Sequence, residues 1–314
     1  LMGVTHVLRA QEHLSNTPKQ MLLAEAMAFR RLNFAHVSLI TNPDGSKMSK
    51  RDKDKALRAV VKQRGIADAP GSVVSRDRWQ WWISDKDNQL DPEEGERLAQ
   101  ALGVSLPEIN VDDFRRNGYL PEVMINYLAL LGWNPGNDIE KFDRNFLIEK
   151  FDLDRVIKSP AKFDREKLLA FNHDAIQVLS PEEFAARLLE HGQRYHPAFV
   201  KDLQNRFTRF AEVQKKRAKT LEDPFRNGQF FLHGAVKGPR DEAKAPLAQS
   251  KDILAQIKPA LESVSASDWR ASTLEVAVKG FLDSNPSISL KDVAQPLRIA
   301  ASGTTVSPPI FDTL

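Results

Sequence analysis

Helical periodicity through the last 140 or so residues is the feature that most limits what this chain can fold into. From residue 173 nearly to the end, apolar residues recur at three- and four-residue spacing, as on helices that bury one face. Ser180–Glu183, with proline second and glutamate fourth, is typical of a capped helix start, and Phe184 and Leu188 follow on one face. Residues 274–282 repeat the pattern. We therefore predict an all-α domain over 173–314.

The first 55 residues have a strand–helix–strand pattern instead. Gly3–Leu8 is rich in apolar and β-branched residues, Pro18 opens a helix, and Val37–Ile40 is a second short apolar run. A strand–helix–strand unit predicts two parallel strands. One such unit is too little sheet for a whole domain, so we expect more of this domain upstream.

The middle of the chain divides into a charged stretch, 56–110, and a helical unit, 111–172. The charged stretch holds three tryptophans, which predict a small local core rather than platforms for stacked RNA bases; they are Trp79, Trp81 and Trp82. In the helical unit, Pro121 is expected to start a helix that Gly132 ends. Its predicted apolar stripe is formed by Met124, Leu128 and Leu131.

Composition excludes several kinds of protein. The chain has no cysteine, which rules out disulfides and thiolate zinc sites within it, and we predict no metal site. No apolar run approaches the roughly 18 residues that span a bilayer, and the start does not resemble a signal peptide. We therefore expect a cytoplasmic protein with no membrane partner.

Positive charge gathers in two separate stretches, although the net charge is only +3. Residues 47–64 hold eight Lys or Arg against two Asp, a net +6, and residues 201–219 hold seven basic against two acidic residues, a net +5. Two separated basic stretches predict contacts with two parts of one long polyanion. Charge alone favours equally the alternative that both are solvated helix faces.

The segment Ser46–Arg51 directly follows the second expected strand and the turn Asn42–Gly45. Its two lysines, Lys47 and Lys50, are three residues apart on a loop, where both can reach the phosphates of a nucleotide. Mobile ammonium groups suit charge that moves onto departing pyrophosphate, and a loop can close after the nucleotide binds. Taken without the preceding strand and turn, two lysines at this spacing would indicate only a solvated basic loop.

In that context, Lys47–Lys50 resembles the signature loop of class I aminoacyl-tRNA synthetases, in the form found in the glutamyl branch. Other segments carry the same resemblance: Met2–Pro18 is similar to the segment before that loop, Gly118–Glu122 and Asn126–Trp133 to the stem-contact helices, and Gln295–Phe311 to the anticodon-binding region. The resemblance implies a mostly α fold with a partial α/β unit. It implies the C-terminal part of a Rossmann-type catalytic domain over 1–55, an insertion over 56–110, a stem-contact domain over 111–172 and a helical anticodon-binding domain over 173–314.

The resemblance also implies roles for residues of the catalytic part. Arg9, Glu12 and His13 fall where the family binds glutamate, and a guanidinium suits a carboxylate because it pairs with both oxygens. The alternative for Arg9 is a structural ion pair. The backbone of Leu39 and Ile40 would read adenine, or these residues are strand core. Lys47 and Lys50 would bind the ATP phosphates and act in catalysis.

For the RNA, the resemblance places a second set of residues in the helical domain. Arg298, Ser307, Pro308 and Ile310 match positions that meet the anticodon, where a proline-stiffened loop presents backbone groups to unstacked bases. The alternative for Ser307 and Pro308 is a plain turn. Three further basic residues, expected to contact phosphates, are Lys215, Lys216 and Arg217.

The implied function is that of a monomeric glutamate–tRNA ligase that uses ATP with Mg²⁺ to charge tRNA(Glu) through glutamyl-adenylate. The family's HIGH-type signature is absent, so we expect a fragment that is inactive alone. The alternative is an inactive, tRNA-binding remnant. A relative that glutamylates a modified tRNA base would lack the helical domain, and a glutaminyl enzyme would have a β-rich anticodon region.

Overall fold

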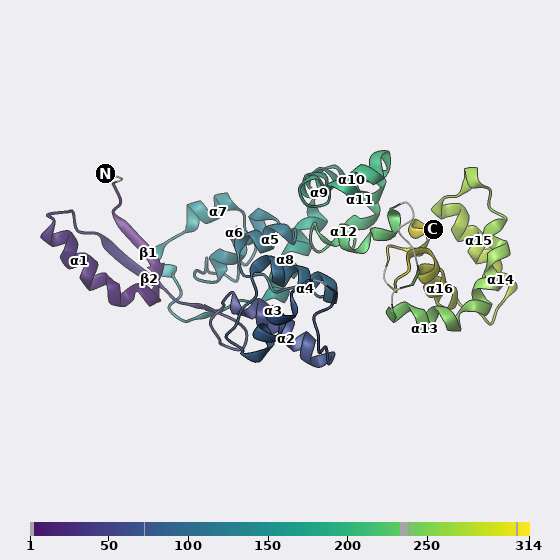
Figure 1. Ribbon diagram of the computed structural model, residues 1–314. Helices are drawn as coiled ribbons and strands as arrows, with labels where there is room; N and C mark the ends of the chain where they lie inside the picture. The colour runs from purple at the N-terminus through teal and green to yellow at the C-terminus, as the bar shows by residue number, and fades with distance from the viewer. Residues whose placement is uncertain (1–2, 72, 233–237, 240, 306) are drawn as a thin grey trace. The chain divides into compact units, whose positions relative to one another are not determined.

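A computed structural model describes residues 3–71, 73–232, 238–239, 241–305 and 307–314 (Figure 1). The chain forms two compact units: unit 1 is Leu1–Arg115 with Pro121–Leu168, and unit 2 is Arg116–Leu120 with Leu169–Leu314. Met2, part of the N-terminal family-like segment, lies outside the described residues, as does Val306. Helices predominate in both units, which confirms the predicted mostly α fold.

Unit 1 begins with the partial α/β unit, and this prediction is confirmed (Figure 1). Strands β1 (His6–Ala10) and β2 (Asn33–Val37) pair in parallel, with His6 opposite Asn33 and Ala10 opposite Val37. Parallel strands need a crossover, which here is the 3₁₀ helix η1 (Gln11–Asn16) and helix α1 (Thr17–Ala26).

The predicted bounds of both strands were wrong. β1 begins at His6 rather than Gly3, whose φ of +66° does not suit a strand. The second strand ends at Val37 instead of starting there, and Ile40–Thr41 forms β3, which pairs in parallel with β4 (Ala161–Lys162). The change of partner follows Ser38, whose hydroxyl donates to the Lys158 carbonyl.

The charged stretch forms helices α2 (Arg51–Gln63), α3 (Arg76–Ser84) and α4 (Pro92–Leu102) around their own apolar cluster. Trp79 and Trp82, three residues apart on one helix face, are 1% and 0% exposed, which confirms the predicted local core. Trp81 does not belong to it: its side chain is exposed, and the Arg78 guanidinium carbon lies 4.3 Å from its ring centroid.

Asp54 is buried in this cluster, where its carboxylate accepts from the Trp82 indole at 2.8 Å and the Leu90 amide at 3.0 Å. We expect Asp54→Ala to lower the free energy of unfolding of unit 1 by about 2–3 kcal/mol, because two buried donors lose their acceptor. Asp54→Asn keeps an oxygen acceptor and should cost less. Denaturant unfolding followed by tryptophan fluorescence measures both, and equal losses would contradict this account.

The rest of unit 1 is helical: α5 (Val111–Arg116), α6 (Pro121–Leu130), α7 (Arg144–Lys150) and η2 (Leu153–Arg155). The predicted helix start at Pro121 is confirmed. Of the predicted stripe, Leu131 is buried and Met124 is half-buried, but Leu128 is 45% exposed. The inward face carries Asn126 and Tyr127 instead. The Tyr127 hydroxyl donates to the Asp164 carbonyl at 2.7 Å, and the Asn126 amide donates to the Glu140 carbonyl at 2.9 Å. These polar partners set the rotation of the helix.

Over its described residues, unit 2 is all-α, as predicted. After α8 (Arg165–Val178), which enters it from unit 1, its helices are α9 (Pro181–Tyr195), α10 (Pro197–Leu203), η3 (Gln204–Arg206), α11 (Phe207–Lys215), α12 (Asp223–Asn227), η4 (Gln229–Phe231), α13 (Asp241–Gln249), α14 (Lys251–Glu262), η5 (Ala266–Asp268), α15 (Ala271–Ser284), α16 (Leu290–Ser302) and α17 (Ile310–Thr313). The predicted cap of α9 is present, with the Glu183 amide donating to the Ser180 hydroxyl at 3.1 Å. Phe184 and Leu188 on α9 are fully buried.

Candidate functional site

Arg9 lies at the carboxyl end of β1, the edge where open α/β sheets bind ligands. Its guanidinium donates to the Gln20 side chain and the Thr17 hydroxyl, both at 2.8 Å. The guanidinium carbon also lies 5.1 Å from the Phe34 ring centroid on β2. Thr17 and Gln20 were not predicted from the sequence, although their three-residue spacing at the start of α1 was a usable signal.

Among the described residues, no carboxylate forms an ion pair with Arg9. Its hydrogen-bond partners, the Gln20 side chain, the Thr17 hydroxyl and the His13 carbonyl, are neutral, and its Nε is buried without a hydrogen-bond partner. The described residues therefore do not form the structural ion pair that was the alternative role for Arg9. A guanidinium held by neutral groups keeps its charge uncompensated, and so it can attract a carboxylate ligand.

The signature loop is tied at both ends to the first turn of α2. The Asp52 carboxylate accepts from the Asn42 amide group and from the Ser49 backbone amide, each at 3.0 Å. Burial acts to raise the pKa of Asp52, but these bonds and a third from Lys55 outweigh it and lower that pKa below its usual value. The loop backbone is thus anchored while Lys47 extends into solvent.

Lys47 joins the loop to the segment after β1. Its ammonium donates to the Glu12 carboxylate at 2.7 Å, and this bond and the charge of Lys47 lower the pKa of Glu12. His13 Nε2 lies 3.9 Å from the other Glu12 oxygen, and the His13 carbonyl accepts from Arg9 at 3.4 Å. The structure therefore brings together Arg9, Glu12, His13 and Lys47.

Lys50 does not join this group. It is the residue directly before α2 and lines a cavity of about 300 Å³ together with Gln89 and Asp91. Lys47 and Lys50 thus have different surroundings, and their convergence on one triphosphate stays a prediction that requires the loop to move.

Leu39 and Ile40 differ in what their backbones can offer a ligand. The Leu39 carbonyl accepts from the Ala161 amide at 3.3 Å, and the Thr41 carbonyl accepts from the Phe163 amide at 2.8 Å. Peptide groups alternate in direction along a strand, so those of Ile40 face the other edge of β3, away from β4. Ile40 can therefore present its amide and carbonyl there, whereas the Leu39 carbonyl is already bonded.

In unit 2, two residues expected to meet the anticodon, Arg298 and Ser307, lie in contact with Arg217, which was expected to contact tRNA phosphates. Arg298 Nε donates to the Ser307 hydroxyl at 3.0 Å, and Arg217 donates to the Ser307 carbonyl. Burial lowers the pKa of Arg298, and the positive charge of Arg217 lowers it further. No described carboxylate forms an ion pair with either arginine. Two adjacent guanidiniums without an acidic partner favour a polyanionic ligand.

The other residues that were predicted to contact tRNA are less accessible to it or have no clear binding group, with the exception of Lys216. Ile310 is 6% exposed and belongs to the apolar cluster of α14–α17, so its side chain lies in the core. Lys215 donates to the Gln177 carbonyl at 2.8 Å, whereas Lys216 is exposed. Pro308 follows Ser307, and its carbonyl accepts from the Ser307 hydroxyl at 2.9 Å.

Two known families match segments of this chain. Residues 1–77 and 106–170 match the family described as tRNA synthetases class I (E and Q), catalytic domain, and residues 183–314 match the anticodon binding domain family. The chain therefore belongs to the class I aminoacyl-tRNA synthetases of the glutamate and glutamine group. The relatives and the solved structure that follow are glutamyl enzymes.

The relatives named here are glutamate–tRNA ligases. The chain is 31% identical to that of Carboxydothermus hydrogenoformans and 32% identical to that of Rhodopseudomonas palustris strain TIE-1, matching 100% of this chain but 54% and 55% of theirs. A solved glutamate tRNA ligase from Elizabethkingia meningosepticum, in complex with its amino acid, has a TM-score of 0.63 at 27% identity, over 100% of this chain and 54% of that one. The chain thus spans about half the length of these relatives.

No helix among the described residues is long and apolar enough to cross a bilayer.

Proposed function

We propose that this chain provides the signature loop and the tRNA-binding part of a glutamate–tRNA ligase. The enzyme would join glutamate to tRNA(Glu) with ATP, as a cytoplasmic monomer. The observation that carries the proposal is the 2.7 Å contact between Lys47 and Glu12, which sets the signature loop beside the segment that holds Arg9. Phosphate-binding and carboxylate-binding groups then border one site.

The reaction needs no nucleophile from the protein. A glutamate carboxylate oxygen attacks the α-phosphorus of ATP, the bond to the bridging oxygen breaks, and pyrophosphate leaves with its electron pair. A ribose hydroxyl of the tRNA end then attacks the acyl carbon and AMP leaves. ATP enters as its Mg²⁺ complex. Arg9 would orient the glutamate, the Ile40 backbone would hold adenine, and Lys47 and Lys50 would neutralise the charge that builds on pyrophosphate.

The test is glutamate-dependent ATP–pyrophosphate exchange with tRNA present, on this chain and on the chain joined to any in-frame sequence encoded upstream of Leu1. Exchange by the extended chain supports the ligase. A second candidate function is that of a catalytically inactive, tRNA-binding remnant. The observation that favours it is the Arg217–Arg298 pair: both arginines contact Ser307 within unit 2, so this candidate RNA-binding group does not depend on the catalytic residues of unit 1. Tight tRNA binding without exchange by the extended chain would establish the remnant and refute the ligase.

Lys47→Ala in the exchange-active polypeptide should lower the maximal exchange rate about tenfold to a hundredfold, because one positive group that neutralises developing charge is lost. Lys47→Arg keeps the charge on a wider head group and should recover part of the rate. Lys19→Ala, an exposed lysine on α1, is the control and should leave the rate unchanged. An unchanged maximal rate in Lys47→Ala would refute the assigned role.

A further inference from the structure

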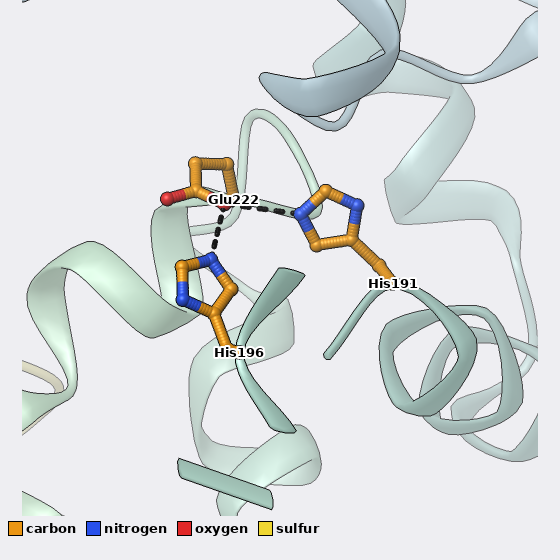
Figure 2. A group of neighbouring side chains, drawn as sticks. All are labelled: His191, His196 and Glu222. Carbon is orange, nitrogen blue, oxygen red and sulfur yellow. Dashed lines mark hydrogen bonds and ion pairs between the residues drawn. The ribbon is translucent and has the colours of Figure 1, made fainter. Parts of the chain in front are cut away.

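A cluster of two histidines and one glutamate in unit 2 has no part in the function proposed above. His191 lies in the last turns of α9, His196 lies between α9 and α10, and Glu222 directly precedes α12. Figure 2 shows both imidazole rings turning one nitrogen toward the same carboxylate. The Nε2 atoms of His191 and His196 lie 3.0 Å and 2.7 Å from Glu222 Oε2, and the three potential ligand atoms lie within 4.8 Å of one another.

The cluster is largely removed from solvent, and His196 is the most exposed of its three side chains. The side chains of His191, Glu222 and His196 are 5%, 16% and 26% exposed. Burial acts to raise the pKa of Glu222, but the bonds from the two histidines outweigh it and lower that pKa to about 2.

We propose that His191, His196 and Glu222 bind one divalent transition-metal ion of the zinc type, with water in the fourth position. Two imidazole nitrogens and one carboxylate oxygen are a ligand set that proteins use for zinc. Imidazole ligands favour zinc, nickel, cobalt or copper over magnesium and calcium, which prefer oxygen. This site was not predicted from the sequence, because 26 residues separate Glu222 from His196 and no local spacing motif marks the set.

The three ligand atoms are already close enough for one ion after a local adjustment. Metal–ligand distances of about 2.0–2.2 Å in a tetrahedron place ligand atoms roughly 3.3–3.6 Å apart. The two nitrogen–oxygen distances, 3.0 Å and 2.7 Å, would open toward that spacing, and the two Nε2 atoms, which lie within 4.8 Å of each other, would adopt it as well. The ion would take the place of the protons on the two Nε2 atoms.

Neighbouring aromatic rings already hold the two imidazoles in place. The His196 ring stacks on Phe225 with centroids 4.6 Å apart and planes 14° apart, and the His191 ring lies 5.0 Å from that of Tyr195. Packing that fixes ring orientation lowers the entropy that the site loses when the ion binds.

The ion would clamp the segment that carries Lys216, Arg217 and Lys219. Residues 216–222 join α11 to α12, and the Leu221 amide in this segment donates to the Gly118 carbonyl at 2.9 Å. The Lys219 carbonyl accepts from the Asn172 side chain at 2.6 Å. Metal binding at Glu222 would add a link from the same segment to the junction of α9 and α10. The expected role is structural.

The test is equilibrium dialysis of the chelator-treated chain against Zn²⁺, with Co²⁺ as a second probe whose visible absorption reports tetrahedral nitrogen and oxygen ligands. We expect one Zn²⁺ per chain, a raised Tm with Zn²⁺, and loss of both in the double variant His191→Gln, His196→Gln. His173→Gln is the matched control, since His173 is a part-buried imidazole of the same unit that contacts the Ala218 carbonyl, outside the cluster. This control should keep full stoichiometry.

A milder variant keeps the test decisive if the double variant does not fold. Glu222→Gln retains a side-chain acceptor for the histidines but offers a poor ligand, and it should weaken Zn²⁺ binding at least tenfold while circular dichroism shows unchanged helix content. No bound Zn²⁺ in the wild-type chain, or equal binding by wild type and Glu222→Gln, would overturn the proposal. Neither result bears on ATP–pyrophosphate exchange, so this site and the proposed ligase function fail separately.

Discussion

Replacing Gly118 with alanine is expected to lower the free energy of unfolding of unit 2 by about 3–5 kcal/mol. Gly118 has a φ of +77°, which costs an L residue roughly 1–2 kcal/mol. A Cβ at this position would also lie 2.5 Å from the Glu222 amide nitrogen and 2.6 Å from that of Leu221. The clash is with backbone that cannot withdraw freely, because the Leu221 amide donates to the Gly118 carbonyl at 2.9 Å. Strain and overlap therefore add.

The matched control is Gly103→Ala, which separates the two contributions. Gly103 ends α4 with a φ of +63°, but no heavy atom lies within 4 Å of its would-be Cβ. It should lose only the 1–2 kcal/mol of backbone strain. Chemical denaturation followed by circular dichroism measures both variants. If the two lose equal stability, the close approach between Gly118 and residues 221–222 is not the cause.

Elements set by neighbouring residues could be predicted from the sequence. Helix α9 follows from Ser180–Glu183 and the apolar spacing of Phe184 and Leu188, which act within one or two turns. The burial of Trp79 and Trp82 also follows, because large aromatic side chains close together are more stable away from water.

Features set by distant partners could not be predicted. The chain changes its strand partner after β2, where Ser38 donates a hydrogen bond to the carbonyl of Lys158, 120 residues away. The rotation of α6 depends on the hydrogen bonds of Tyr127 and Asn126. The sequence of residues 228–246 is polar with little helical pattern, yet α13 begins at Asp241. Its alanines favour a helix, but Pro246 within it conceals this pattern. Residues 233–237 and 240 of that segment lie outside the described residues.

The candidate site was predicted in part for the same reason. Arg9, Glu12 and His13 are close in sequence, so a short strand and one 3₁₀ turn bring them together. The approach of Lys47 to Glu12 was not predictable from spacing, because the two are 35 residues apart. The three-residue spacing of Lys47 and Lys50 suggested that they converge, but Lys50 directly precedes α2 and lines a cavity with Gln89 and Asp91, whereas Lys47 contacts Glu12.

The second large effect concerns Arg9. In the exchange-active polypeptide, Arg9→Ala should lower kcat/KM for glutamate by roughly 10²–10⁴, since each hydrogen bond from a charged donor to a carboxylate contributes about 1.5–3 kcal/mol and a guanidinium can form two. The loss should appear in KM for glutamate, with KM for ATP little changed. Arg9→Lys keeps the charge but loses the paired geometry, so it should be intermediate.

Two controls separate ligand binding from local structure. Arg30→Ala removes an exposed arginine just after α1 and should leave kcat/KM unchanged. Gln20→Ala removes a neutral partner of Arg9 while leaving the guanidinium in place, so it should cost far less than Arg9→Ala. If Gln20→Ala and Arg9→Ala lose equal activity, or if Arg9→Ala raises KM for ATP instead, then Arg9 supports the fold of η1 and α1. In that case Arg9 would not bind the carboxylate of glutamate.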